Sequence, residues 1–507
     1  MTNRWSGEAG LTEHDPIEVG TQGDPALMRV VRDLTLAYRT PAPPSAARID
    51  AAVVRALQQR TELPNLPRRG GVRVFPVRYQ PSPRRLAHLS WRLTLLLTIT
   101  SFGGGLAAAR ALPHTSAPDN NASPILRTVP VGINPGPIAI DSRTGRAFVA
   151  SDGQYGNTDG SVSMLDAATG KVLGSTTVGV APAAIAVDVS SSRVLVVNSQ
   201  LHSSKGPRGT VSMLDARDGR LLRTIRVGAI PFDVVVDEGT NRAFVLNTYF
   251  STYTQGDGQV QHSTNANVSV LDATTGRVMR TIDLGPNPAP FLGHALALDG
   301  RRHVVFVPAF AGLSLLDARS GLLLRTLPKL GRVQAVDEVS GYIFVYNYTP
   351  AYDSYDYPGK QTIVFDPYRG RVVRTVAGVY VFLQDHRAGR IIGSSARALY
   401  LLDAHSGRIA RTIRLSQYHL PPAFAQPGPT LLAVDQVRGR ALVAFAGPVD
   451  SQYTPTGNGL LAVVDDRTGA LVRTVPVGRN PLVATVDPAS GHAFIVNGDS
   501  NDVTVLR

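Results

Sequence analysis

Four polar segments of the chain are rich in tyrosine and are the best candidates for a binding surface. Residues 150–160, 247–267, 346–361 and 447–459 hold nine of the 16 tyrosines, mixed with Asp, Asn, Ser and Gly. Tyr offers a large amphipathic contact area at low entropy cost, and small polar residues supply adaptable hydrogen bonds. We therefore expect binding through Tyr155, Tyr249, Tyr253, Asp257, Tyr348, Tyr352, Tyr355, Tyr357 and Tyr453. The alternative is that these segments only pack over one another on an exposed surface.

Residue types that would catalyse a reaction or bind a metal form no local motif. The chain has no Gly-x-Ser-x-Gly elbow, no His-Glu-x-x-His pair and no Gly-x-x-x-x-Gly-Lys-Ser/Thr loop. It also has no Cys, which excludes disulfides, thiol nucleophiles and thiolate metal sites. His202, His262, His294, His386 and His419 are scattered, without metal-ligand spacing. We expect no catalytic residue, no metal ion and no cofactor, although an active site assembled from distant segments would leave no local motif.

The elements that position these segments repeat along the chain. Each unit reads as four short apolar strands, with one Asp at the end of the first strand and another at the end of the third. The first Asp stands at 141, 188, 237, 299, 337, 385, 435 and 487, and the second at 166, 215, 272, 317, 366, 403 and 465. Intervals between the second positions are 37 to 62 residues, the size of a four-stranded propeller blade.

The Asp residues have a structural role in turns such as DSRTG (141–145) and DAATG (166–170). The Asp side chain can accept hydrogen bonds from the following backbone amides, and the Gly four residues later can take the positive φ that closes a hairpin. The pattern predicts an all-β protein, a β-propeller with eight blades or, since unit six (377–403) is degenerate, seven. RTVPVG (127–132) resembles the fourth strand of a unit, but no first, second and third strands precede it. We therefore expect it to complete the last blade.

These repeats resemble a known family. GRAFVASDG, GSVSMLDAATGKVLGSTTVG and GHAFIVNGDSNDVTVLR are similar to the YVTN β-propeller repeat family, although this chain reads VLVVN, AFVLN or IFVYN at the name-giving strand. The resemblance covers roughly 126–507 and implies the fold, whereas propellers of this kind serve many functions. Lactonase-type propellers also resemble these repeats, so a hydrolase is one alternative function.

The two faces of such a propeller differ in this sequence. One face carries the short Asp-Gly turns, whereas the other carries the long Tyr-rich segments and the connections between blades. Binding loops vary in length more freely than scaffold turns, so we expect function on the long-loop face. Pro-containing connections at 131–137, 227–233 and 477–483 bring Asp233 toward the channel mouth as a further binding residue.

A basic region and an apolar run precede the repeats. Residues 93–109 are uncharged and just long enough to span a bilayer. Residues 63–92 carry seven Arg and no acid, whereas 111–126 carry no Lys or Arg, so the positive-inside rule places the N-terminus in the cytoplasm. A cleaved signal peptide is the alternative, because Ala109-Arg110-Ala111 resembles a cleavage site. Much of the net charge of +13 lies before residue 112, and nucleic acid is therefore not an expected partner.

The sequence thus predicts four regions. Residues 1–90 form an Arg-rich cytoplasmic segment with helical patterns at 26–38 and 45–60. Residues 91–112 form a single transmembrane anchor, 113–125 form a linker, and 126–507 form the propeller. The expected function is an extracytoplasmic binding or scaffold module in the cell membrane of a bacterial-type cell, with a protein or cell-envelope ligand as partner. The alternatives are the lactonase-like hydrolase and a transmembrane sensor.

Overall fold

The computed structural model describes residues 123–153, 158–199, 209–254, 260–286, 296–309, 312–328, 330–346, 361–379, 381–395, 397–421, 430–450 and 455–507. The chain divides into two units, residues 1–81 and 82–507, and every described residue belongs to the second. The predicted cytoplasmic segment and membrane anchor lie outside the described residues and stay predictions. No helix within the described ranges is long and apolar enough to cross a membrane.

The described chain forms eight antiparallel sheets of four strands, which are the predicted blades. Blades one to four are β2 (Pro135–Asp141), β3 (Arg146–Ser151), β4 (Asp159–Asp166) and β5 (Val172–Val180); β6 (Pro182–Asp188), β7 (Arg193–Asn198), β8 (Thr210–Asp215) and β9 (Leu221–Arg226); β10 (Pro231–Asp237), β11 (Arg242–Thr254), β12 (Val260–Asp272) and β13 (Val278–Pro286); and β14 (Ala297–Asp299), β15 (Val304–Ala309), β16 (Gly312–Asp317) and β17 (Leu322–Leu327). Blades five to seven are β18 (Arg332–Asp337), β19 (Tyr342–Tyr346), β20 (Gln361–Asp366) and β21 (Arg371–Ala377); β22 (Val381–Asp385), β23 (Arg390–Ser394), β24 (Ala398–Asp403) and β25 (Ile409–Arg414), followed by the 3-10 helix η1 (Leu415–Tyr418); and β26 (Thr430–Asp435), β27 (Arg440–Phe445), β28 (Leu460–Asp465) and β29 (Leu471–Pro476).

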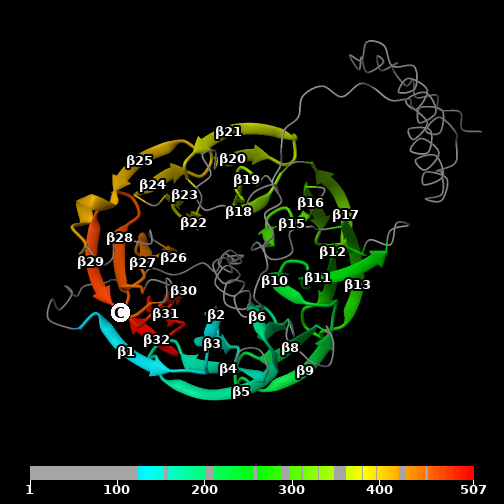
Figure 1. Cartoon of the computed structure of the whole chain (residues 1–507), viewed down its shortest axis with the longest axis horizontal. Coiled ribbons are helices and arrows are strands. Elements are labelled where there is room, and N and C mark those ends of the chain that lie inside the picture. Colours follow the sequence, from blue (N-terminus) through cyan, green and yellow to red (C-terminus); the bar gives the residue numbers. More distant parts are fainter. Residues whose placement is uncertain are drawn as a thin grey trace, which may run out of the picture. The chain divides into compact units, whose positions relative to one another are not determined.

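Blade eight closes the ring with both ends of the repeat region. Its order is β1 (Ile125–Pro130), β32 (Asp502–Leu506), β31 (Ala493–Asn497) and β30 (Pro481–Val486), with Thr128 opposite Thr504. The inner strands contact one another in the order β2, β6, β10, β14, β18, β22, β26, β30 and back to β2 (Figure 1). This confirms eight blades and the predicted closing strand, and the degenerate unit six is a complete blade.

Each pair of neighbouring blades shares one apolar core, and strand alternation explains how. On β10, Val234 and Val236 belong to the core between blades two and three, whereas Val235 belongs to the core between blades three and four. Successive side chains of a strand point to opposite sides of the sheet. Because both sides of each blade are covered by neighbours, its middle strands are almost continuously apolar, as the sequence shows.

The turns follow the predicted chemistry and extend it. Gly145, Gly170 and Gly219 have φ between +64° and +73° at the fourth position after the turn Asp. Where a first turn lacks Gly, the same position still has a positive φ, in Ser192, Asn241 and His303 at 55°. Backbone geometry therefore repeats more faithfully than the Gly pattern does.

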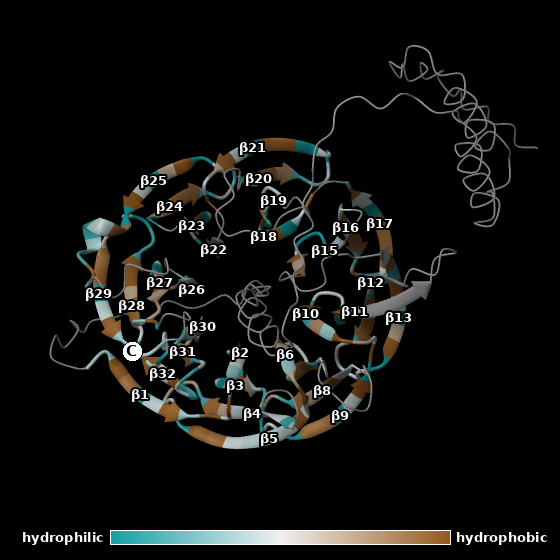
Figure 2. Ribbon diagram, in the orientation of Figure 1, coloured by the Kyte–Doolittle hydropathy of each residue, from teal (hydrophilic) through white to brown (hydrophobic). Residues whose placement is uncertain are grey.

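The outermost strands combine exposed aliphatic residues with a β-bulge. In blade four Leu322, Leu323 and Leu324 are exposed, and the pairing shifts between Leu315 and Leu316, just before Arg325. Equivalent irregularities occur where β5, β9, β13, β21, β25 and β29 pair with their neighbours. Figure 2 shows the apolar stretches of these rim strands. A bulge followed by a charged residue hinders edge-to-edge pairing with another sheet.

One predicted loop is largely a hairpin. The sequence predicts a long loop over residues 247–267, but β11 and β12 remain paired from Arg242 opposite Asp272 to Thr254 opposite Val260. The segment TYFSTYT (248–254) consists mainly of Thr, Tyr and Phe, which favour strands, so the ladder continues past the blade. Blade three therefore carries a two-stranded extension on the long-loop side.

Candidate functional site

The loop face, defined here as the face that holds the starts of the inner strands, has a rigid framework around the channel. In blades one, two, three and eight, a residue with φ between 45° and 54° directly precedes the Pro that starts the inner strand: Asn134, Ala181, Ile230 and Asn480. The carbonyl of each accepts a hydrogen bond from a backbone amide of the second strand or of the residue after it: Asp152, Ser199, Thr248 and Gly498. The connections between these blades are thus fixed by backbone geometry.

Asp233 lies on this face, near the start of β10. Its side chain is 6% exposed, its Oδ1 accepts from the Val234 amide at 2.8 Å and its Oδ2 from the Leu296 amide at 2.5 Å. Burial raises the pKa of this carboxyl to about 7, against the lowering effect of the two amides and of the Arg332 charge. In the other units the residue four before the turn Asp is apolar: Pro137, Ala184, Ala295, Val333, Val381, Leu431 and Val483. Asp233 is therefore a buried acid at a core position.

Arg332, which the sequence analysis did not single out, is the charged group that interacts with Asp233. It is the first residue of β18, two blades from β10, and its Nε and Nη2 are buried without a hydrogen-bond partner. Burial lowers the pKa of Arg332 to about 9, and the Asp233 charge opposes this shift. Among the described residues no ion pair within 4.0 Å joins the two groups or involves either of them.

A sequence signal for Arg332 exists in the repeat alignment. At the same position, five before the turn Asp, the other units carry Gly136, Ala183, Phe232, His294, Tyr380, Thr430 and Leu482. An Arg in this mostly uncharged, variable series is an exception. The electrostatic influence of Asp233 on Arg332 could not be predicted because it depends on how far apart two non-adjacent blades lie.

The structure does not test the other predicted binding residues. Tyr155, Asp257, Tyr348, Tyr352, Tyr355, Tyr357 and Tyr453 lie outside the described residues. Tyr249 and Tyr253 are on β11, for which the backbone alone is described there. Asp233 is thus the one predicted site residue whose side chain can be placed.

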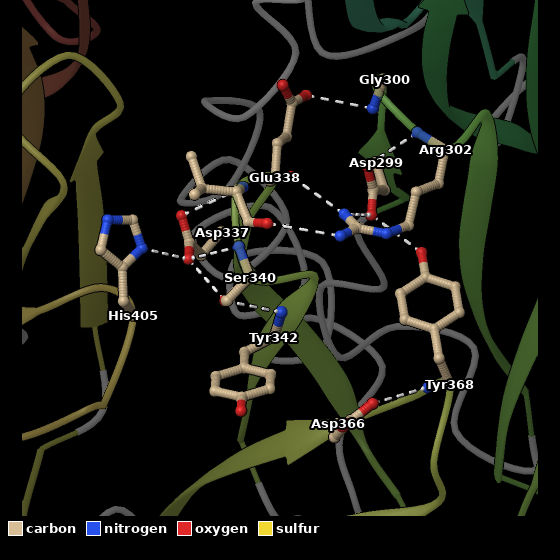
Figure 3. A network of polar contacts seen from close by, with 11 residues as sticks. Asp299, Gly300, Arg302, Asp337, Glu338, Ser340, Tyr342, Asp366, Tyr368 and His405 are labelled. Atoms are coloured by element: carbon tan, nitrogen blue, oxygen red, sulfur yellow. Dashed lines mark hydrogen bonds and ion pairs between the residues drawn. The ribbon is translucent and has the colours of Figure 1, made fainter.

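The opposite face, which we call the turn face, carries a dense polar network in blades four to six (Figure 3). The Tyr368 hydroxyl donates to Asp299 Oδ2 at 2.8 Å, and Arg302 donates to the Glu338 carbonyl at 2.9 Å. His405 Nδ1 lies 2.6 Å from Asp337 Oδ2. Burial alone would raise the pKa of Asp337, but hydrogen bonds from Ser340 and His405 lower it overall. The buried carboxylates of Asp299 and Asp337 each accept several hydrogen bonds, which favours a structural role for them.

Polar contacts of this kind join every neighbouring pair of blades on the turn face. From the junction of blades eight and one onward, the contacts are Ser490 Oγ to the Ala167 carbonyl, Arg143 to Ser192, the Val189 amide to Glu238, His303 to Asp237, the Gly300 amide to Glu338, His405 to Asp337, Arg390 to Asp466 and Arg438 to the Ser490 carbonyl. Within the described ranges no group of three or more His, Asp or Glu side chains is arranged to hold a metal ion. The turn face therefore reads as a scaffold, and the loop face holds the candidate site.

Comparisons with known proteins agree in fold class alone. No protein-family model matches the chain, and no curated protein matches it in sequence. Among solved structures it is similar to BamB from Moraxella catarrhalis, with 15% identity and a TM-score of 0.47 over 76% of this chain and 99% of that one. It is also similar to the dihydro-heme d1 dehydrogenase NirN, with 15% identity and a TM-score of 0.45 over 90% and 91% of the two chains. A third similar structure is hydrazine synthase from Kuenenia stuttgartiensis, with 19% identity and a TM-score of 0.40 over 74% and 95%. The chain is a β-propeller protein distantly similar to these structures.

Proposed function

We propose that this protein is a binding or scaffold module of the cell envelope that recognises a protein or cell-envelope ligand through its loop face. In this proposal the propeller is of the YVTN type and stands outside the cytoplasm. A single span within residues 91–112 anchors it in the membrane. The Arg-rich flank before that span and the lack of Lys and Arg after it support this orientation.

The observation that carries the proposal is the contrast between the two faces. On the turn face, polar groups of the Asp-centred turns form hydrogen bonds within and between blades, although Oδ2 of Asp141 and of Asp466 has no hydrogen-bond partner. On the loop face, β11 and β12 extend as a hairpin. The buried carboxyl of Asp233 and the half-buried Arg332, whose Nε and Nη2 are buried, occupy positions where other blades carry mostly apolar or uncharged residues. Buried N–H donors without a hydrogen-bond partner, such as Nε and Nη2 of Arg332, cost stability, so their presence favours a role in recognition over one in folding.

The test replaces four tyrosines of blades three and five in the full chain. Tyr253, Tyr352, Tyr355 and Tyr357 changed to Ser should abolish capture of a partner from cell-envelope extract that the wild type retains. A few aromatic residues dominate most interfaces, each worth roughly 1–4 kcal/mol when truncated. Together they should cost at least ~4 kcal/mol, about a thousandfold in affinity.

A matched control lies on the opposite face. Asp272 accepts the Thr275 amide at 2.8 Å in a turn of the same blade. Asp272→Ala should lower stability by about 1 kcal/mol without changing capture. Wild-type affinity of the quadruple Ser variant, with unchanged circular dichroism, would rule out the Tyr-rich surface.

A further inference from the structure

We propose that Arg332 binds the carboxylate of a ligand at the loop-face end of the channel. This inference rests on the proposed binding function and narrows it to one chemical class. It concerns a described pair of side chains that is separate from the Tyr-rich segments.

The free edge of the Arg332 guanidinium matches the shape of a carboxylate. Nε–H and Nη2–H lie on one side of the planar group and point in nearly parallel directions. These are the two atoms that are buried without a hydrogen-bond partner. Arg edges of this kind bind planar two-oxygen anions through paired hydrogen bonds. Two buried N–H donors of a half-buried guanidinium that make no hydrogen bond are costly, and a ligand carboxylate would satisfy both donors at once.

Asp233 does not satisfy this edge. Its two oxygens accept the backbone amides of Val234 and Leu296, and no ion pair within 4.0 Å to Arg332 is present in the described structure. Leu296 directly precedes β14, the inner strand of blade four, which is only three residues long. Asp233 therefore anchors the strand that lies between the two charged residues, while Arg332 keeps its donors free.

The charge balance favours a carboxylate over a phosphate. One guanidinium faces the ligand, and the nearby Asp233 contributes negative charge whenever it is ionised. A group with a single negative charge fits this arrangement, whereas a phosphate dianion would be repelled more strongly by Asp233. The carboxylate can belong to a small free acid or to the C-terminus of a peptide.

The experiment measures binding of 13C-labelled acetate to the full chain in detergent by NMR line broadening. Saturable binding is expected for the wild type. Arg332→Gln should weaken it at least tenfold, and Arg332→Lys, which keeps the charge but loses the planar edge, should weaken it nearly as much. Asp233→Asn, which removes the repelling charge, should strengthen it several-fold. Arg280→Gln, at an exposed position on β13, should leave it unchanged.

Three further ligands test the preference for a carboxylate and show whether it comes from a small acid or from a peptide C-terminus. Inorganic phosphate should bind more weakly than acetate. A short peptide with a free C-terminus should outcompete acetate only if peptides are the natural source, and its amidated form should not compete. Unchanged acetate binding in Arg332→Gln, weaker binding in Asp233→Asn, or tighter binding of phosphate would each overturn the proposal. Circular dichroism of each variant excludes misfolding. Partner capture through the tyrosines is measured separately, so either idea can fail without the other.

Discussion

At the scale of single residues, two acids break the repeat in the same way. Asp233 replaces an apolar residue, and Asp466 occupies the position that holds Ala167, Ala216, Ala273, Ala318 and Ala404 in other units. Asp466 is 1% exposed and lies 2.5 Å from Arg390 of the neighbouring blade. Burial raises the pKa of Asp466 to about 7, and a hydrogen bond with Asp385 and its charge add to this, while the Arg390 charge opposes it.

This raised pKa predicts a pH dependence of stability. Because the folded state holds the Asp466 proton more tightly than the unfolded state, its stabilising contribution is full below pH ~4 and is lost as the pH rises through about 7. Wild-type melting temperature should therefore fall from pH 5 to pH 8. Asp466→Asn should make this decline shallower, since one such group is removed, while Asp233 still contributes in the same direction.

Thermal unfolding followed by circular dichroism at several pH values checks this. Loss of one linked proton changes the slope by at most about 1.4 kcal/mol per pH unit. Asp218→Asn, at a side chain that is 59% exposed, is the control and should keep the wild-type slope. Parallel curves for wild type and Asp466→Asn would show that Asp466 does not titrate in this range.

At the scale of elements, β1 matters most because it joins the two ends of the propeller. Val129 of β1 is 7% exposed and belongs to the core shared by blades eight and one, and Thr128 beside it is exposed. A charge in this core has no partner, whereas a charge on the outward side of an edge strand is well tolerated.

Val129→Asp should therefore cost about 3 kcal/mol or more and promote aggregation, because a detached β1 leaves β32 as an unpaired edge. Thr128→Asp, with the same charge one residue away, should change stability by less than about 0.5 kcal/mol. Urea unfolding and light scattering of the full chain measure both effects. Equal stability of the two variants would mean that β1 does not close the ring in solution.

At the scale of the whole molecule, eight shared cores and eight polar junctions hold the described blades in a closed ring. The polar junctions lie on the turn face, where an inserted residue would separate the side chains and backbone groups that form hydrogen bonds between two neighbouring blades. Loop-face segments, in contrast, already differ in length from blade to blade.

Insertions of Gly-Ser-Gly-Ser-Gly should therefore affect the two faces differently. Placed between Val339 and Ser340, the insertion breaks the bond from the Ser340 amide to Asp337 at 3.0 Å and displaces the Val339 carbonyl from Arg302. A loss of about 2–4 kcal/mol is expected in urea unfolding. The same insertion between residues 257 and 258 should cost less than about 1 kcal/mol, since loop length has a small entropic cost. Equal losses at both places would contradict the division into scaffold and binding faces.

The sequence alone determined the features that repeat locally. Turn Asp and Gly residues, short apolar strands and the lone fourth strand before the first unit predicted eight four-stranded blades and their closure by β1, because each depends on residues close together in the chain. Asp233 was selected from the Pro-containing connection that precedes it in the sequence. Its role in binding, and that of the tyrosines that the same reasoning selected, remain predictions.

Tertiary structure decided the contacts that join different blades. His303 meets Asp237 across 66 positions, Arg390 bonds with Asp466 across 76, and Arg332 interacts with Asp233 from two blades away. It also decided that 248–254 continues a strand, because pairing with β12 supplies hydrogen bonds that no single segment reveals. Local patterns encode turns and strand faces, whereas these pairings depend on the curvature and closure of the ring, which emerge only once all eight blades pack together.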